Sequence, residues 1–215
     1  MIAVLGDGIS FPDPREGEPD GLIAIGGDLS VERLTEAYNQ GIFPFYSFRC
    51  YRTILWYCPL DRFVIFPDEI HVSHSLRTLL NSNKLYVTFN QDFNSVIEQC
   101  SQLRYDEDYA WLGDDMVRAY KRLSQNGNAK SVEVWNAENQ LVGGLYGVAQ
   151  KGCFFGESMF SLVPSASKVA LVALARKMQA EGGKFIDCQF ETPHLKSMGG
   201  RHISYEEYLS IVNER

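Results

Sequence analysis

Apolar and polar residues follow a helical spacing in several parts of this chain. The longest such stretch runs from Ala166 to Glu181 and stops at a glycine pair, which is a usual helix end. Its apolar residues form one broad face: Val169, Leu171, Val172, Leu174, Ala175 and Met178. The same spacing predicts helices at residues 31–40, 73–80, 92–103 and 114–126 and, with a Ser-x-x-Glu capping box, from Ser204 onward.

Other segments have the composition and spacing of strands. A strand within residues 152–161, the long helix and a strand at 185–190 form a strand–helix–strand unit. Because side chains alternate along a strand, the second strand is expected to place Asp187 and Gln189 on one face and Ile186 and Cys188 on the other. Further strands are predicted at 63–66, 85–88, 131–135 and 141–147, the last two as a hairpin around residues 136–140.

The order of these elements indicates a fold class. From residue 84 onward it is strand, two helices, a run of antiparallel strands, helix, strand, helix. This order suits an α+β fold of the GNAT acyltransferase type, in which an acyl donor lies in a cleft beside a splayed sheet. The length of 215 residues is enough for one or two domains with a substantial core.

Composition narrows the setting in which the protein works. No apolar run approaches the ~20 residues of a membrane span, and the N-terminus lacks a basic segment ahead of an apolar one, so no membrane segment or signal peptide is expected. The five cysteines are widely spaced and form no Cys-x-x-Cys, which indicates reduced cytoplasmic thiols without a zinc site. His71 and His74 have too few neighbouring ligands to bind a metal.

The charge of the chain limits how it can bind nucleic acid. A net charge of −7 argues against a protein that coats nucleic acid electrostatically. The charge is uneven, because residues 1–45 carry eight acidic and two basic side chains, whereas residues 46–104 carry five acidic and six basic ones. The weakly basic middle permits limited contact with the end of a nucleic acid.

Two features are candidates for chemistry. Asp187 and Gln189 are a carboxylate and an amide on a largely apolar strand, and from spacing alone the simpler interpretation is that backbone groups satisfy them. The alternative is a pair that handles a proton at an active site. Aromatic loops at residues 41–46 and 55–59 leave a similar choice between a small core packed by rings, which is the simpler interpretation, and a platform on which a base stacks.

Seven short motifs resemble those of the leucyl/phenylalanyl-tRNA–protein transferase family along nearly the whole chain. Each motif is short, but their order and spacing together are highly specific. They are the segments Asp20–Ser30, Ala37–Pro44, Ser131–Trp135, Leu141–Ala149, Gly156–Ser161, Ala166–Lys168 and Ile186–Gln189.

The resemblance implies a small N-terminal domain at residues 1–62 and a GNAT-like catalytic domain at residues 63–215. It implies transfer of Leu or Phe from aminoacyl-tRNA to proteins that begin with Arg or Lys, which marks them for N-end rule degradation. Met should be accepted less well, because an apolar pocket discriminates only modestly between related side chains. The protein is expected to be a cytoplasmic monomer without membrane contact that holds the tRNA mainly through its 3′ end.

The resemblance also assigns residues to roles. Asp187 and Gln189 match the catalytic pair, and Glu157 matches an acid near the incoming basic N-terminus. The pocket for the Leu or Phe side chain is matched by Leu145, Phe154, Met159, Leu171, Met178 and Ile186. Aromatic positions near the terminal adenosine are matched by Tyr38, Trp111 and Tyr120, and by Phe45, which stands where the family commonly has Trp.

Two other functions belong to different classes. An acyl-CoA-dependent GNAT enzyme cradles pyrophosphate on a glycine-containing turn, and residues 157–167, at the matching place, contain no glycine, which counts against CoA. A non-catalytic aminoacyl-tRNA-binding module would not need Asp187 and Gln189 together. Conversion of an aminoacyl ester to an amide is downhill, so no nucleotide hydrolysis is required. No cofactor or metal is expected.

Overall fold

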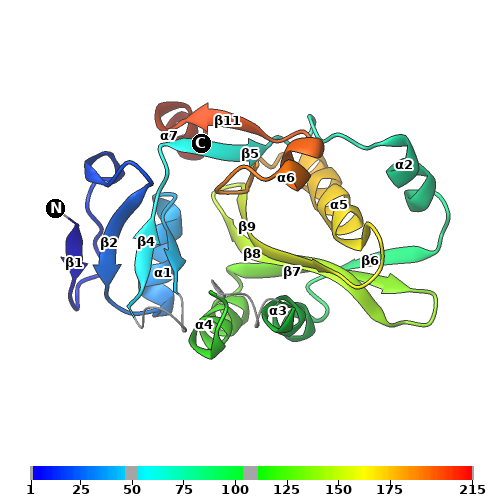
Figure 1. Cartoon of the computed structure of the whole chain (residues 1–215), viewed down its shortest axis with the longest axis horizontal. Helices are drawn as coiled ribbons and strands as arrows, with labels where there is room; N and C mark the ends of the chain where they lie inside the picture. Colours follow the sequence, from blue (N-terminus) through cyan, green and yellow to red (C-terminus); the bar gives the residue numbers. More distant parts are fainter. Residues whose placement is uncertain (1, 47–52, 104–110, 215) are drawn as a thin grey trace.

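The computed structural model describes residues 2–46, 53–103 and 111–214. In this part of the chain the strands form a four-stranded sheet and a seven-stranded sheet. Figure 1 shows the two sheets next to each other, the smaller one built from the N-terminal residues and the larger one with helices on both faces. Within the same ranges, no helix is both long enough and apolar enough to cross a bilayer.

The small sheet has the strand order β1-β2-β4-β3. Its first two strands are parallel, and its other pairs are antiparallel. A helix, α1, follows β2 and begins after Ser30, whose hydroxyl oxygen accepts a hydrogen bond from the backbone N–H of Arg33. The elements are β1 (Ala3–Leu5), a 3₁₀ helix (Pro14–Glu16), β2 (Leu22–Gly26), α1 (Val31–Asn39), β3 (Phe43–Phe45) and β4 (Leu55–Tyr57).

The large sheet has the strand order β11-β5-β10-β9-β8-β7-β6. Most of its strands are antiparallel, but β9 and β10 are parallel neighbours, as a strand–helix–strand unit requires. The strands are β5 (Asp61–Ile65), β6 (Leu85–Phe89), β7 (Ala129–Asn136), β8 (Leu141–Gln150), β9 (Cys153–Ser161), β10 (Ile186–Asp187) and β11 (Arg201–Ser204).

Helices cover both faces of the large sheet and divide the interior into two cores. On one face, α3 and α4 join α1, α7 and the small sheet in a core rich in aromatic rings, such as Tyr38, Trp56, Tyr120 and Tyr208. On the other face, α5 packs on the sheet with α2 beside it. The helices are α2 (His74–Leu80), α3 (Phe93–Gln102), α4 (Asp114–Gln125), α5 (Ala166–Ala180), α6 (Pro193–Ser197) and α7 (Tyr205–Asn213).

Most of the predicted elements are confirmed. The fold is a mixture of helices and strands in which a small N-terminal unit precedes a larger one, and all six apolar residues predicted for one face of α5 are buried. The hairpin of β7 and β8 is present and is longer than predicted. The division at residues 62 and 63 falls inside β5, whose five residues all belong to the large sheet.

The predicted strand at residues 185–190 is wrong in its length. Only Ile186 and Asp187 form β10, because the chain turns at Gln189, which has a positive φ of 59°. The alternation of side chains therefore does not continue to Gln189, and the expectation that it shares a strand face with Asp187 is wrong. The consequences appear at the candidate site.

Candidate active site

Glu157 is the extra residue of a β-bulge between β8 and β9. Tyr146 pairs with Ser158 and Gly147 pairs with Gly156, so Glu157 has no partner in the register. A bulge redirects the side chain of its extra residue. Position 147 has to be glycine for β8 and β9 to approach each other in this register, because a Cβ atom there would lie 2.0 Å from the carbonyl oxygen of Phe155.

Two buried tyrosines hold the carboxylate of Glu157. The hydroxyl group of Tyr38, from α1, lies 2.7 Å from Oε1, and that of Tyr120, from α4, lies 2.8 Å from Oε2. The two hydroxyl groups are 2.6 Å apart. Burial raises the pKa of Glu157 to about 7, and the hydrogen bonds from the two tyrosines oppose this shift. A carboxyl group with this pKa can carry or release a proton near neutral pH.

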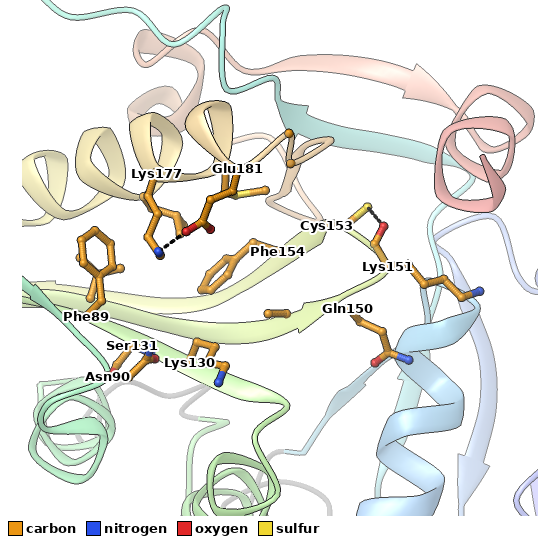
Figure 2. A pocket seen from close by; sticks show the side chains of 17 residues that line it. Phe89, Asn90, Lys130, Ser131, Gln150, Lys151, Cys153, Phe154, Lys177 and Glu181 are labelled. Carbon is orange, nitrogen blue, oxygen red and sulfur yellow. Dashed lines mark hydrogen bonds and ion pairs between the residues drawn. The ribbon is translucent and has the colours of Figure 1, made fainter. Parts of the chain in front are cut away.

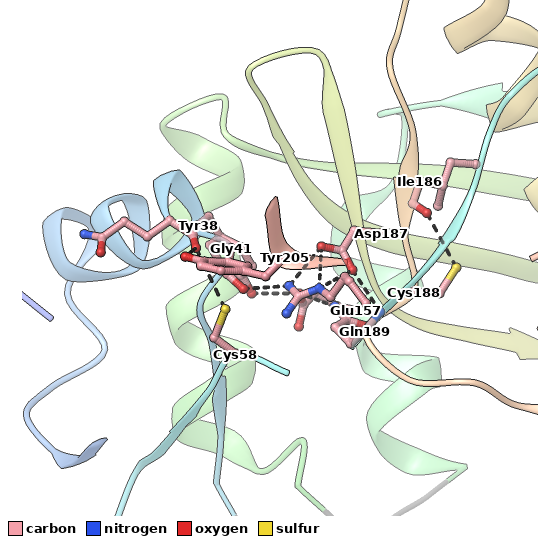
Figure 3. Close-up of polar contacts among 11 residues, drawn as sticks. Tyr38, Gly41, Cys58, Glu157, Ile186, Asp187, Cys188, Gln189 and Tyr205 are labelled. Carbon is pink, nitrogen blue, oxygen red and sulfur yellow. Dashed lines mark hydrogen bonds and ion pairs between the residues drawn. The ribbon is translucent and has the colours of Figure 1, made fainter. Parts of the chain in front are cut away.

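Gln189 sits in a tight turn directly after β10. The backbone N–H of Phe190 donates to the carbonyl oxygen of Cys188 over 2.7 Å, which closes a three-residue turn around Gln189. A residue other than glycine rarely adopts a positive φ, and such residues concentrate at functional sites. The turn carries the Gln189 side chain to within 3.3 Å of Glu157 Oε1 (Figure 3).

The hydrogen-bond partners of the Gln189 amide determine its orientation. One terminal atom of the amide faces the carbonyl oxygens of Gly156 and Cys188, each at 3.0 Å. Carbonyl oxygens only accept hydrogen bonds, so this atom is the nitrogen. The amide oxygen of Gln189 then points toward Glu157 Oε1. Both oxygens accept hydrogen bonds, so a group with several N–H donors can bind between them.

Asp187 lies behind this turn and is fully buried. Its two carboxylate oxygens each accept a hydrogen bond of 2.9 Å from Nε of Arg62, at the start of β5. Oδ1 also accepts a 2.9 Å hydrogen bond from the backbone N–H of Gln189. Asp187 thus contacts the main chain of Gln189 rather than the space next to Glu157.

A cavity of about 260 Å³ opens beside Glu157 and Gln189, and we call it the Glu157 cavity. It is apolar on most sides and polar at the end where these two side chains lie. Ile186, Cys188 and Gln189 all line it, whereas Asp187 does not, which corrects the predicted division of the strand faces. Of the six predicted pocket residues it is lined by five: Leu145, Phe154, Met159, Leu171 and Ile186.

The sixth residue, Met178, lines a separate cavity of about 400 Å³, which we call the Met178 cavity (Figure 2). Phe154 and Leu174 line both cavities and form the wall between them. Lys177 and Glu181 stand on one side of the Met178 cavity and form an ion pair with each other. The structure therefore places Met178 beyond the wall of the Glu157 cavity.

The predicted aromatic residues fall into two groups. Tyr38 and Tyr120 are buried, and their hydroxyl groups contact Glu157. Phe45 and Trp111 are partly exposed and stack on each other, with ring centroids 6.3 Å apart and an interplanar angle of 26°. A series of ring contacts leads back from this pair to the mouth of the Glu157 cavity, through Tyr57, Phe43 and Phe190.

Two family models match most of the chain. The model of the leucyl/phenylalanyl-tRNA protein transferase family matches residues 64–213, and the model of the N-terminal domain of that family matches residues 27–60. The chain belongs to this family, and it is a transferase enzyme.

Curated relatives resemble the chain over almost its whole length. Leucyl/phenylalanyl-tRNA–protein transferase of Pseudomonas aeruginosa is 50% identical over 204 residues, which are 94% of this chain and 89% of the relative. The protein of the same name from Syntrophobacter fumaroxidans is 49% identical over 95% of this chain and 86% of its own length. For that from Flavobacterium johnsoniae the values are 45%, 95% and 96%.

Solved structures resemble the chain in fold at low sequence identity. L-PGS from Bacillus licheniformis has a TM-score of 0.44 and 13% identity, over 76% of this chain and 54% of that one. An aminoglycoside acetyltransferase from an uncultured soil metagenomic sample has a TM-score of 0.40 and 13% identity, over 60% of this chain and 88% of its own.

In this member of the family, backbone N–H groups at the start of α5 donate to acceptors within the chain. Ser161 Oγ accepts a hydrogen bond of 2.7 Å from the backbone N–H of Ser167. The backbone N–H of Ala166 donates to the carbonyl oxygen of Val163. A pyrophosphate cradle needs free backbone N–H groups at this place, so two of its donors already have partners. Within the described ranges, no three His, Cys, Asp or Glu side chains gather as ligands for a metal ion.

Sequence reasoning missed three parts of the site. It gave no role to Arg62, no hydrogen bond between the two tyrosines and Glu157, and no bulge at Glu157. The sequence held a signal for Arg62, because it directly precedes the apolar segment 63–66. If that segment is buried, the cation lies at the edge of a core, where a charged side chain needs a partner. The tyrosine contacts join residues 119 and 37 positions apart, and local patterns carry no signal for them.

Proposed function

We propose that the protein transfers Leu or Phe, and Met less well, from aminoacyl-tRNA to the α-amine of proteins that begin with Arg or Lys. The product would carry a new N-terminal residue that marks it for degradation by the N-end rule. Aminoacyl-tRNA is made in the cytoplasm, so the reaction belongs there. All the side chains that carry the proposal come from one chain, and a monomer is therefore sufficient.

The observation that carries the proposal is the Glu157 cavity. Its apolar walls suit an aliphatic or aromatic hydrophobic side chain, and its polar end brings Glu157 and Gln189 to the place where the carbonyl carbon of the donor would lie. A volume of about 260 Å³ is large enough for a Leu or Phe side chain. Apolar walls discriminate by only about 1–3 kcal/mol per methylene group, which leaves Met as a weaker donor.

The polar end of the cavity suits the acceptor amine. An α-amine that attacks the aminoacyl ester forms a C–N bond, the ester C–O bond breaks, and the tRNA leaves with its terminal ribose hydroxyl group. The Gln189 oxygen can hold one N–H of the amine, and ionised Glu157 can attract the cationic residue or take up a proton. Holding the two reactants in place supplies much of the rate, up to about 7–11 kcal/mol in well-oriented systems.

The partly exposed stack of Phe45 and Trp111 supports a site for the 3′ end of the tRNA. It is linked by ring contacts to Phe190 at the mouth of the cavity, and aromatic faces bind bases without regard to their identity. The donor ester would then span the distance between a terminal base on these rings and a side chain inside the Glu157 cavity.

A transfer assay tests the proposal. Protein at a concentration far below its substrates is mixed with labelled Leu-tRNA or Phe-tRNA and a peptide that begins with Arg, and label in the peptide is measured over time. We expect many turnovers with both donors, none with a peptide that begins with Asp, and none with labelled acetyl-CoA. Transfer from acetyl-CoA would make this an acyl-CoA-dependent enzyme, and binding of the tRNA without turnover would make it a non-catalytic module.

A further inference from the structure

Arg62 is buried in the interior at the meeting point of three segments. Only 1% of its side chain is exposed. Its guanidinium group lies between the rings of Phe43, 5.0 Å away in the small sheet, and Tyr208, 5.3 Å away in α7. Its Nη2 donates a 2.6 Å hydrogen bond to the carbonyl oxygen of Gly41, which follows α1. The side chain therefore joins the N-terminal unit and the last helix to the large sheet.

The same guanidinium group fixes the carboxylate of Asp187. Nε lies 2.9 Å from both carboxylate oxygens, and Nη2 lies 2.9 Å from Oδ2. Burial lowers the pKa of the Arg62 guanidinium group, but the Asp187 carboxylate together with Tyr208 and Cys58 outweighs burial and raises this pKa. Both side chains of the pair are enclosed, with exposed fractions of 1% for Arg62 and 0% for Asp187.

The ion pair is one hydrogen bond away from the turn at Gln189. Asp187 Oδ1 accepts from the backbone N–H of Gln189 over 2.9 Å, and this residue has the positive φ that aims its side chain at Glu157. A turn of this kind is costly for a residue with a Cβ, so it persists only where its surroundings hold it. The hydrogen bond to Asp187 holds the backbone N–H of Gln189 in this turn.

We infer that Arg62 is a positioning residue for the transfer reaction: it fixes Asp187, which in turn holds Gln189 in the turn that presents its amide to the acceptor amine. Arg62 touches no substrate, since it does not line the Glu157 cavity. This inference rests on the proposed function, because the amide of Gln189 matters only if an acceptor binds beside Glu157.

Several ionisable groups surround Asp187 besides Arg62, and they decide how its charge responds to a mutation. They are Glu157 from β9, Tyr208 from α7, and the thiols of Cys58, Cys153 and Cys188. None of these is a cation. Without Arg62, the Asp187 carboxylate would be buried among neutral or acidic groups and would bind a proton more readily.

The test compares Arg62→Met, which removes the cation, with Arg62→Lys, which keeps the charge but loses the planar fork. Arg201→Met is the matched control, because Arg201 lies on the neighbouring strand β11 and also pairs with carboxylates, those of Glu69 and Glu207, but is exposed. Single-turnover transfer from pre-bound aminoacyl-tRNA is measured from pH 6 to pH 9, together with donor affinity and thermal unfolding.

We expect Arg62→Met to lower the single-turnover rate by about 100-fold, as a small misplacement of a reacting group does, with donor affinity almost unchanged. Beyond the rise of the acceptor amine that all variants share, its rate should show an extra alkaline step that the wild type and Arg62→Lys lack, as Asp187 loses the proton. A role limited to stability would not add such a step. Arg201→Met should match the wild type in rate and profile.

Two further results keep the test decisive. If Arg62→Met fails to fold, the double variant Arg62→Met/Asp187→Asn removes the isolated charge and should fold, with a low rate and the pH profile of the wild type. A wild-type rate in the folded double variant, or a wild-type rate and profile in Arg62→Met, would overturn the inference alone. No transfer by the wild-type protein would overturn the proposed function and this inference with it.

Discussion

Glu157 and Asp187 are two buried carboxylates of one site, and the structure holds them in different ways. Asp187 faces a guanidinium group and a backbone N–H, and neither side of the ion pair reaches solvent. Glu157 faces two phenol groups, keeps some exposure through its cavity, and has a pKa raised by burial to about 7. One carboxylate is enclosed in an ion pair, and the other lies beside an open cavity and can change its charge near neutral pH.

This difference separates positioning from chemistry. A carboxylate that is fully enclosed and lies outside the cavity can orient its neighbours but does not contact a substrate there. A carboxylate that titrates near neutral pH beside an open cavity can exchange a proton with a substrate. We therefore propose that, of the predicted catalytic pair, Asp187 acts as a buried support and Gln189 is the side chain that reaches the cavity.

The largest effect is expected from Asp187→Asn, which keeps an acceptor for the N–H of Gln189 but leaves Arg62 without its counter-ion. Removing one partner of a buried ion pair costs about 3–5 kcal/mol, so thermal unfolding should occur at a much lower temperature and transfer should fall with it. Activity is measured on the folded fraction at low temperature. Unchanged stability would mean that the pair is less enclosed than its contacts indicate.

The next effect concerns Gln189, and here the turn allows a matched comparison. Gln189→Gly suits the positive φ and should leave stability unchanged or raise it by about 1 kcal/mol, whereas Gln189→Ala keeps the strain. Both lose the amide, so both should transfer roughly 10²–10³-fold more slowly, as in enzymes that lose one well-placed hydrogen-bonding group. If only the alanine variant loses activity, the backbone rather than the amide is what matters.

The sequence predicted the chemical identity of this site better than its geometry. The motif around Glu157 and the segment Ile186–Gln189 named three residues that the structure links through Gln189, whose backbone contacts Asp187 and whose side chain contacts Glu157. The strand that was expected to align Asp187 with Gln189 ends at Asp187, because a positive φ in a glutamine has no signature in composition or spacing. Helix α5 was predicted almost to the residue, since its periodicity and glycine stop are local features.

Long-range partners account for what the sequence could not supply. Arg62 and Asp187 are 125 positions apart, and nothing in the neighbourhood of either names the other. The bulge at Glu157 depends on Gly147 meeting the carbonyl oxygen of Phe155 across two strands. Each of these features is set by how distant segments pack, which a single sequence without relatives does not reveal.

A third prediction sharpens the contrast between the carboxylates through Glu157→Gln. Glu157 is largely protonated below its pKa of about 7 and ionised above it, so wild-type transfer should rise with pH through this region. The acceptor amine, with a pKa of about 7.7–8.0, adds a second rise. The variant should keep only the second rise and lose preference for Arg over neutral N-terminal residues. Two identical pH profiles would remove Glu157 from the reaction.

The same substitution has a signed effect on stability. The pKa of Glu157 is raised in the folded state from 4.5, so between pH 4.5 and about 7 the folded protein binds more protons than the unfolded chain. Wild-type stability should therefore decline as the pH rises through this window, relative to Glu157→Gln. Thermal unfolding of both proteins at pH 4.5 and pH 8 measures the difference, and a gap that widens in the opposite direction would contradict the shift.

The smallest effect on transfer is expected beyond the wall formed by Phe154 and Leu174. Met178→Phe enters the cavity of about 400 Å³ rather than the Glu157 cavity, so the ratio of Phe to Leu transfer should stay close to that of the wild type. Leu171→Phe is the matched control on the same helix, because Leu171 lines the Glu157 cavity. Filling that cavity should exclude the larger Phe donor first, by about 1–3 kcal/mol relative to Leu. Competition between the two charged tRNAs gives both ratios in one experiment. An equal loss of Phe transfer in the two variants would show that the wall yields and that the two cavities act as one pocket.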